Sequence, residues 1–245
     1  MFHLSIQPQS VWGVIGDSFK LYFNTFKRVF LIAFLFALLA EVPQMIVHYH
    51  YGEPLFRGSF FVILGIDIIV FWLVVCLLYY MYQLMTNSNH GIKDSIRTTL
   101  IKFPLYFIAS IIMAIIVVIA SLLLLIPGIF LHYLLGFFIF CILFENKGII
   151  SSFKRSAQLV WGNWWRTFFV LVFPMIFAII LFVLFDVVFD YPVFLLYRFH
   201  PLTLGHSIHA VSIIVATVMF PWLLAINLCM YHDLKLRWQT KHFLR

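Results

Sequence analysis

Histidine and carboxylate side chains near the ends of several apolar segments have a spacing suited to binding a metal ion. His206 and His209 are three residues apart and Asp186 and Asp190 are four apart, so each pair shares one face of a helix. Imidazole and carboxylate ligands together suit Zn²⁺ or another divalent transition metal. No His-Glu-x-x-His motif fixes the ligand order, and histidines of a solvated loop explain the same pattern. The candidate metal ligands are His48, His50, His206 and His209.

Carboxylates within or beside apolar segments suggest a different chemistry, the passage of a solute or ion. Asp67 lies several residues inside an apolar run, and a charge at that depth costs a few kcal/mol on membrane-insertion scales. Its side chain should therefore face protein or water, or be protonated. A polar contact between helices explains Asp67 equally well. The candidate residues of a transport path are Asp67, Glu41, Asp186 and Asp190.

Cations and tryptophans between residues 145 and 166 indicate a third chemistry, contact with lipid headgroups. Tryptophan prefers the membrane boundary, where its ring is buried and its N–H stays wet. Each Lys or Arg near an anionic membrane surface contributes about 1 kcal/mol of attraction. The same charges also serve as a signal for membrane orientation. The headgroup candidates are Lys147, Lys154, Arg155, Trp161, Trp164, Trp165 and Arg166.

Catalytic motifs are missing from the sequence. It contains no Gly-x-Ser-x-Gly, no phosphate-binding Gly-x-x-x-x-Gly-Lys-Ser/Thr loop and no neighbouring Cys/His pair. Its three cysteines, Cys76, Cys141 and Cys229, are scattered through apolar segments without a Cys-x-x-Cys spacing. We expect no catalytic residue, no cofactor and no enzymatic activity.

Composition indicates the elements that must position these residues. Of 245 residues 64% are hydrophobic and 10% charged, which is too apolar for a water-soluble domain of this size. A span needs roughly 20 apolar residues, so the chain has room for about six. We expect a single all-α membrane domain over residues 1–245. The predicted transmembrane helices are 29–47, 60–85, 104–126, 128–144, 168–188 and 208–231.

The longest uncharged run, from Phe103 to Phe144, is too long for one span. As a single helix it would extend about 63 Å, whereas the hydrocarbon core of a bilayer is about 30 Å thick. Pro127 and Gly128 lie near its middle and favour a turn. The run therefore predicts a hairpin of two spans, with a re-entrant loop as the alternative.

The positive charges predict the orientation in the membrane. Of sixteen Lys and Arg residues, only Arg57 and Arg198 lie outside the N-terminal segment, two polar connectors and the C-terminal segment. With both termini in the cytoplasm, the inner segments sum to about +10 and the outer ones to about −3 by formal charge. We expect a multi-pass protein of a bacterial inner membrane with its N- and C-termini inside, and no nucleic-acid partner.

Three inner segments share a pattern that predicts an internal repeat. Each has an amphipathic helical periodicity, precedes two spans and carries a short motif: Asp17-Ser-Phe-Lys20, Asp94-Ser-Ile-Arg97 or Ser151-Ser-Phe-Lys154. The unit is an interfacial helix followed by a transmembrane hairpin, used three times. The predicted interfacial helices are 10–27, 91–103 and 149–163.

Several local motifs resemble a known family. Ser10-Val-Trp12, Ile126-Pro-Gly-Ile129 and the stretch from Glu145 to Asn163 are similar to the YciC-like inner-membrane proteins of bacteria. The resemblance implies six spans and leaves the function open. The central pattern also resembles the membrane domain of some glycerophosphodiester phosphodiesterases, although the chain has no room for their catalytic barrel.

The sequence favours a non-enzymatic membrane protein that engages anionic phospholipid, or a membrane complex, through its basic and Trp-rich cytoplasmic collar. Membrane lipids are the expected partners, with a membrane protein or a second copy of the chain as further candidates. The alternative function is a transporter or channel for a small solute or metal ion, using Asp67 and the outer His and acid residues. A membrane metalloenzyme is a third class.

Overall fold

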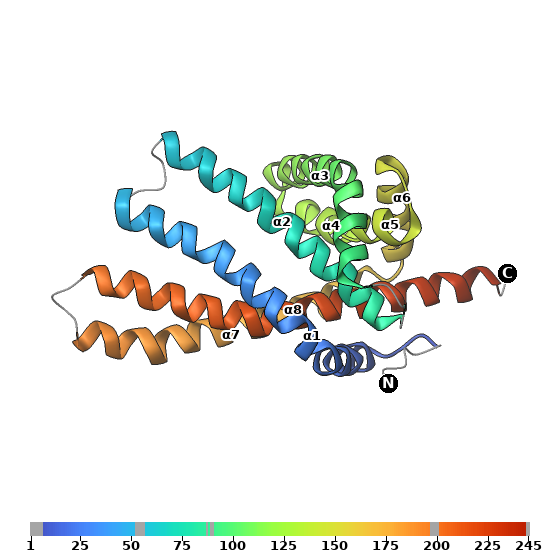
Figure 1. The fold of residues 1–245 in the computed structure, drawn as a ribbon. Helices are drawn as coiled ribbons and strands as arrows, with labels where there is room; N and C mark the ends of the chain where they lie inside the picture. Colours follow the sequence, from blue (N-terminus) through green and yellow to red (C-terminus); the bar gives the residue numbers. More distant parts are fainter. Residues whose placement is uncertain (1–6, 52–56, 87, 89–90, 197–200, 244–245) are drawn as a thin grey trace.

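The computed structural model describes residues 7–51, 57–86, 88, 91–196 and 201–243, with side chains at 44–45, 47–51, 57–59, 186, 189–196, 201–212 and 242–243 left out. Within these ranges every regular element is an α-helix, so the all-α prediction is confirmed (Figure 1). The eight helices are α1 (Val11–Tyr51), α2 (Arg57–Met85), α3 (Ile92–Leu123), α4 (Leu125–Leu135), α5 (Phe138–Glu145), α6 (Ile149–Val160), α7 (Trp164–Leu196) and α8 (Pro201–Phe243).

Five segments among the described residues are long and apolar enough to cross a membrane, which supports the membrane-protein assignment. The first predicted span, 29–47, lies within α1 but is not among them, so a sixth span stays a prediction. The five segments are Phe60–Met85, Ile92–Leu123, Leu125–Glu145, Trp164–Phe185 and Ile213–Lys241.

Two of the predicted interfacial helices are not separate elements. Residues 10–27 run into the first predicted span within α1, and residues 91–103 run into the next within α3. Pro104, at the second of these junctions, lies inside α3 without ending it. The interfacial position of both segments stays a prediction. The third junction differs: Gly162 has φ +86°, a conformation that favours glycine, and it lies between α6 and α7.

The predicted hairpin is present, but its turn lies earlier than expected. Leu124, in an extended conformation, separates α3 from α4, so Pro127 falls in the first turn of α4, where its missing N–H costs little. A Cβ built at Gly128 would lie 1.9 Å from Ser121 Oγ and 2.9 Å from Ser121 Cα. Only glycine fits this close approach of the two helices.

The second arm of the hairpin, which contains the predicted span 128–144, is broken into two helices. Helix α4 ends at Leu135 and α5 begins at Phe138. Ser156 stabilises the break: its hydroxyl accepts a hydrogen bond from the Phe137 N–H at 3.1 Å and donates one to the Leu134 carbonyl at 2.9 Å. In Figure 1, α3 is seen end-on at its label while α2, α7 and α8 are seen lengthwise, so this part of α3 crosses their direction.

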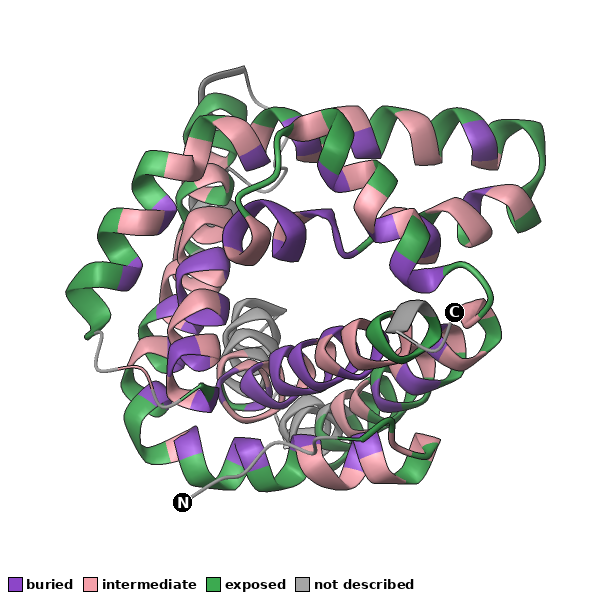
Figure 2. Cartoon of the chain, turned by 90° about the vertical axis from the view of Figure 1, so that its right-hand side faces the viewer, coloured by how far each residue is buried: buried purple, intermediate pink, exposed green. Residues whose placement is uncertain are grey.

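Helix α8 forms the centre of the core. It packs most extensively against α1 and also contacts α7, and most of its side chains between Pro221 and Leu234 are buried. Exposed residues, by contrast, lie along the outer sides of the surrounding helices (Figure 2). These surfaces are apolar, as expected for protein that faces lipid.

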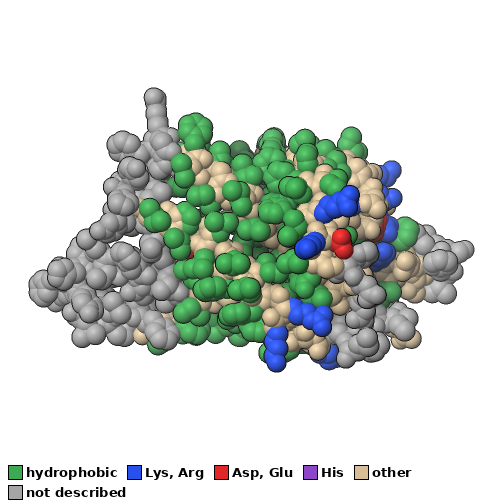
Figure 3. All heavy atoms as spheres, viewed as in Figure 1, with side chains coloured by type: hydrophobic (Ala, Val, Ile, Leu, Met, Phe, Trp, Pro, Cys, Tyr) green, Lys and Arg blue, Asp and Glu red, His purple; other side chains and the backbone are tan. Residues whose placement is uncertain are grey.

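Lys and Arg side chains gather toward the end of the molecule where α8 terminates, and hydrophobic side chains cover its middle (Figure 3). The first turns of α1 lie toward the same end (Figure 1). We call this end the basic end. It contains the ion pairs described next.

Candidate functional site

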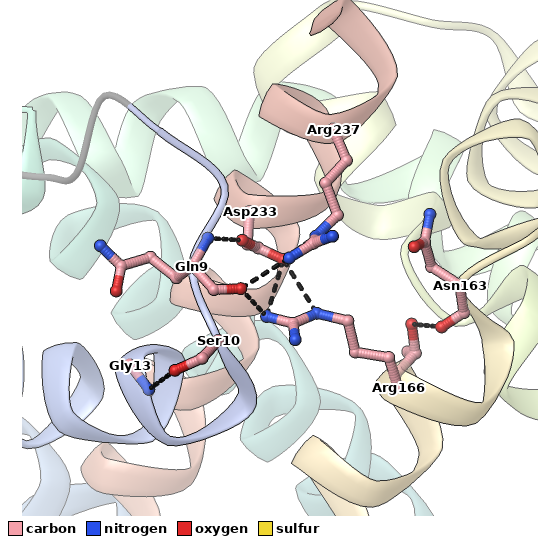
Figure 4. A network of polar contacts seen from close by, with 8 residues as sticks. Gln9, Ser10, Gly13, Asn163, Arg166, Asp233 and Arg237 are labelled. Atoms are coloured by element: carbon pink, nitrogen blue, oxygen red, sulfur yellow. Dashed lines mark hydrogen bonds and ion pairs between the residues drawn. The ribbon is translucent and has the colours of Figure 1, made fainter. Parts of the chain in front are cut away.

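Two arginines and one aspartate join the N-terminal segment to α7 and α8. The Arg237 Nε donates to Asp233 Oδ2 at 2.8 Å, and Arg166 Nη2 lies 3.1 Å from the same oxygen. Both guanidinium groups also donate to the Gln9 carbonyl oxygen, at 2.7 Å from Arg166 and 2.6 Å from Arg237. The Gln9 N–H donates to Asp233 Oδ1 at 2.7 Å (Figure 4). We call Gln9, Arg166, Asp233 and Arg237 the arginine clamp.

Asp233 is the buried centre of the arginine clamp, and both of its carboxylate oxygens are used. Asp233 is 2% exposed, and each of its oxygens accepts at least one hydrogen bond. A buried carboxylate held by two guanidinium groups is stable only while all the partners remain. The clamp therefore fixes the segment before α1 against the start of α7 and the C-terminal part of α8.

A second buried ion pair joins α5, α6 and α8. The Arg155 Nε donates to Glu145 Oε2 at 2.9 Å, and the Tyr231 hydroxyl donates to Glu145 Oε1, also at 2.9 Å. The Arg155 guanidinium carbon lies 4.0 Å from the centre of the Trp238 ring, a cation–π contact. Arg155 thus supports Trp238 from one side.

A cavity of about 790 Å³ lies between α6, the C-terminal end of α8 and Pro8. Its volume is in the range of small-molecule binding sites. Three cations and no Asp or Glu line it, and Trp161, which is 67% exposed, forms part of its wall. We call it the Trp161–Trp238 pocket. Its lining residues are Pro8, Lys154, Ala157, Gln158, Leu159, Trp161, Gly162, Asn163, Arg237, Trp238, Thr240 and Lys241.

The structure separates the predicted headgroup residues into three groups. Lys154 and Trp161 line the pocket, whereas the guanidinium groups of Arg155 and Arg166 are used in ion pairs inside the protein. The remaining three lie elsewhere on the basic end: Lys147 and Trp165 are exposed, and the Trp164 indole N–H donates to the Phe130 carbonyl oxygen at 3.1 Å.

Four residues of the pocket wall, Thr240 among them, come from α8 and were not among the predicted headgroup residues. Arg237, Trp238 and Lys241 lie in the last turns of the helix, where i and i+4 share a face. The sequence alone shows that Arg237 and Lys241 are four residues apart with Trp238 between them, a pattern that could have marked them as headgroup candidates. Sequence alone could not show that α6 lies opposite them.

The predicted transport and metal residues are not brought together among the described side chains. Asp67 is exposed on α2 and makes no hydrogen bond or ion pair in the described part of the chain. Glu41 is partly buried and interacts with another residue of the protein. No group of three His, Cys, Asp or Glu residues suited to a metal occurs in the described ranges. The side chains that lie outside them are His48, His50, Asp186, Asp190, His206 and His209.

Comparison with known proteins gives a family. No curated protein and no solved structure matches the chain. The resemblance to YciC-like proteins and to phosphodiesterase membrane domains is tested by none of these comparisons and stays a prediction. A family model described as a domain of unknown function (DUF7847) matches residues 60–234, which is most of the chain, so the protein belongs to that family.

Proposed function

We propose that this protein is a non-enzymatic membrane protein that binds the headgroup of an anionic phospholipid in the Trp161–Trp238 pocket. The observation that carries the proposal is the pocket's lining, which combines three cations with two tryptophans and contains no carboxylate. Such a lining attracts a phosphate group and repels no part of it.

The place of the pocket in the fold supports a lipid as the source of the phosphate. Trp161 and Trp165 are both exposed at the start of α7, which continues as an apolar span from Trp164. Tryptophans mark the level of the headgroups. A headgroup in the pocket would therefore lie at the depth where phospholipid phosphates occur.

We further propose that the basic end faces the cytoplasm of a bacterial inner membrane, with both termini inside and six spans in three repeated units. The excess of Lys and Arg at this end supports the orientation. The repeat is supported by the second residue of each motif: Ser18, Ser95 and Ser152 are all fully buried. The cation two residues further on is exposed in every case, at Lys20, Arg97 and Lys154.

The lipid proposal is tested by removing the two pocket cations that make no ion pair among the described residues. We expect Lys154→Gln with Lys241→Gln to weaken retention of phosphatidylglycerol by about 25-fold, since each cation contributes about 1 kcal/mol. Native mass spectrometry of lipid adducts on the detergent-purified protein would measure it.

The matched control is Lys93→Gln with Lys147→Gln, because both side chains are exposed, neither lines the pocket, and the change in net charge is identical. Retention that falls equally in both double variants would show diffuse attraction to the surface and reject the pocket as the binding site. The lipid proposal as a whole fails if wild-type protein retains phosphatidylglycerol no better than phosphatidylcholine.

A further inference from the structure

The cations of the Trp161–Trp238 pocket differ in how far their charge is already compensated. Lys154 and Lys241 make no hydrogen bond or ion pair among the described residues. Arg237 donates from Nε to Asp233 and from Nη2 to the Gln9 carbonyl, but it shares Asp233 with Arg166, so Asp233 offsets part of its charge. With no carboxylate in the lining, the two lysines leave the pocket with at least about two uncompensated positive charges.

Two uncompensated charges distinguish between classes of phosphate. A phosphodiester, as in phosphatidylglycerol, carries one negative charge. A phosphate monoester carries about 1.5 to 2 negative charges at pH 7, because its second pKa is about 6. The monoester therefore matches the charge of the pocket, and the diester leaves one lysine without a counter-ion.

Neutral side chains in the lining suit the extra oxygens of a monoester. The side-chain amides of Gln158 and Asn163 make no hydrogen bond in the described part of the chain, so their N–H groups can donate to a ligand. The terminal phosphate of a monoester presents three strong acceptor oxygens. The two lysines and two amides supply donors for all three.

We infer that the Trp161–Trp238 pocket selects a lipid whose headgroup is a phosphate monoester over one whose headgroup is a phosphodiester. This inference rests on the proposed function and narrows its ligand. Phosphatidic acid is the simplest lipid of this class and serves as the probe. Its preference over phosphatidylglycerol should be about five-fold, the effect of one additional cation.

The same chemistry makes the preference depend on pH. Lowering the pH through about 6 protonates the monoester to a single negative charge, whereas the phosphodiester keeps its charge. Lys154, Arg237 and Lys241 are the charged groups of the lining. Asp233 and Glu145 are ion-paired behind the wall, and His232 lines other cavities. The preference should therefore be present at neutral pH and vanish at pH about 5.

The experiment compares retention of phosphatidic acid, phosphatidylglycerol and phosphatidylcholine by native mass spectrometry of the full chain in detergent. Wild-type protein should retain phosphatidic acid about five-fold better than phosphatidylglycerol at pH about 7.5. At pH about 5 it should retain the two lipids equally. Lys154→Gln and Lys241→Gln should each abolish the preference. Lys93→Gln with Lys147→Gln should keep it. A further arm adds water-soluble glycerol 3-phosphate as a competitor.

The outcomes separate this inference from the proposed function. Equal retention of both anionic lipids above phosphatidylcholine, lost in the pocket variants, would overturn the selectivity and leave headgroup binding intact. Retention of neither anionic lipid above phosphatidylcholine would overturn both. Displacement of phosphatidic acid by an equal concentration of glycerol 3-phosphate would show that the pocket reads a soluble phosphate, and the lipid would be the wrong ligand.

Discussion

Helices α7 and α8 are neighbours that each contain a long apolar segment, but they bury very different fractions of it. The apolar segment of α7 is 11% buried, whereas that of α8 is 56% buried, although both are apolar enough to cross a membrane. In a membrane protein, a helix that is apolar enough to cross the bilayer can therefore lie either in the core or against lipid. The difference comes from neighbours: α8 packs against α1 along much of its length, and α7 leaves most of its surface to lipid.

The contrast between the two helices is tested most strongly in the C-terminal part of α8, where Asp233 lies in the arginine clamp. Asp233→Asn would leave Arg166 and Arg237 partly buried without a counter-ion. We expect a loss of about 3 to 5 kcal/mol in the free energy of unfolding, as for a broken buried ion pair. Thermal unfolding in detergent would measure it.

The control for Asp233→Asn is Asp17→Asn, which removes the Asp17–Lys20 pair, whose lysine side chain is 69% exposed. A pair of this kind typically contributes less than about 1 kcal/mol. Equal decreases in unfolding temperature for the two variants would show that the arginine clamp does not stabilise the fold more than an exposed ion pair does.

A smaller effect is expected from shortening one aliphatic side chain on each helix. Leu228 of α8 is fully buried, and Leu228→Ala should cost about 2 to 5 kcal/mol because it leaves a cavity. Ile180 of α7 is 51% exposed, so detergent or lipid fills the space after Ile180→Ala and the cost should be less than about 1 kcal/mol. Loss of folded protein on heating in detergent would rank the two, and the reverse order would place α7 in the core.

The smallest effect is expected at the hydroxyl of Tyr231, through which α8 contacts Glu145. Tyr231→Phe removes one hydrogen bond but leaves the Arg155–Glu145 pair, so we expect a loss of about 1 kcal/mol. Tyr80→Phe is a matched control, since Tyr80 is partly buried and has no hydrogen bond among the described residues. If both variants unfold at the same temperature, the Tyr231 hydroxyl does not contribute.

The parts of the fold that depend on local sequence could be predicted. Apolar runs gave the five segments found, and Pro127 with Gly128 gave a turn within a few residues of the observed one. The break at Gly136 and Phe137 could not be predicted, because it is stabilised by Ser156 from a different helix. A periodicity argument sees neighbours along one helix and not the side chains that approach from another.

The candidate site could be predicted only in part, because some of its features also depend on contacts between distant parts of the chain. Lys154 and Trp161 were identified from their composition and place in the chain, and both line the pocket. Arg155 and Arg166 lie in the same basic, Trp-rich stretch, but each forms an ion pair inside the protein. Arg155 pairs with Glu145 and Arg166 pairs with Asp233. Whether a cation is available to a ligand depends on tertiary contacts, which the sequence pattern does not contain.

The arginine clamp also sets an order on how the protein is made. Gln9 is synthesised early, yet its partners Arg166, Asp233 and Arg237 follow 157, 224 and 228 residues later. The N-terminal segment must therefore wait, on the correct side of the membrane, until the last helix has been inserted. Closure of the clamp is then a final assembly step, and a ribosome stalled before Asp233 would leave Gln9 with Arg166 but without Asp233 and Arg237.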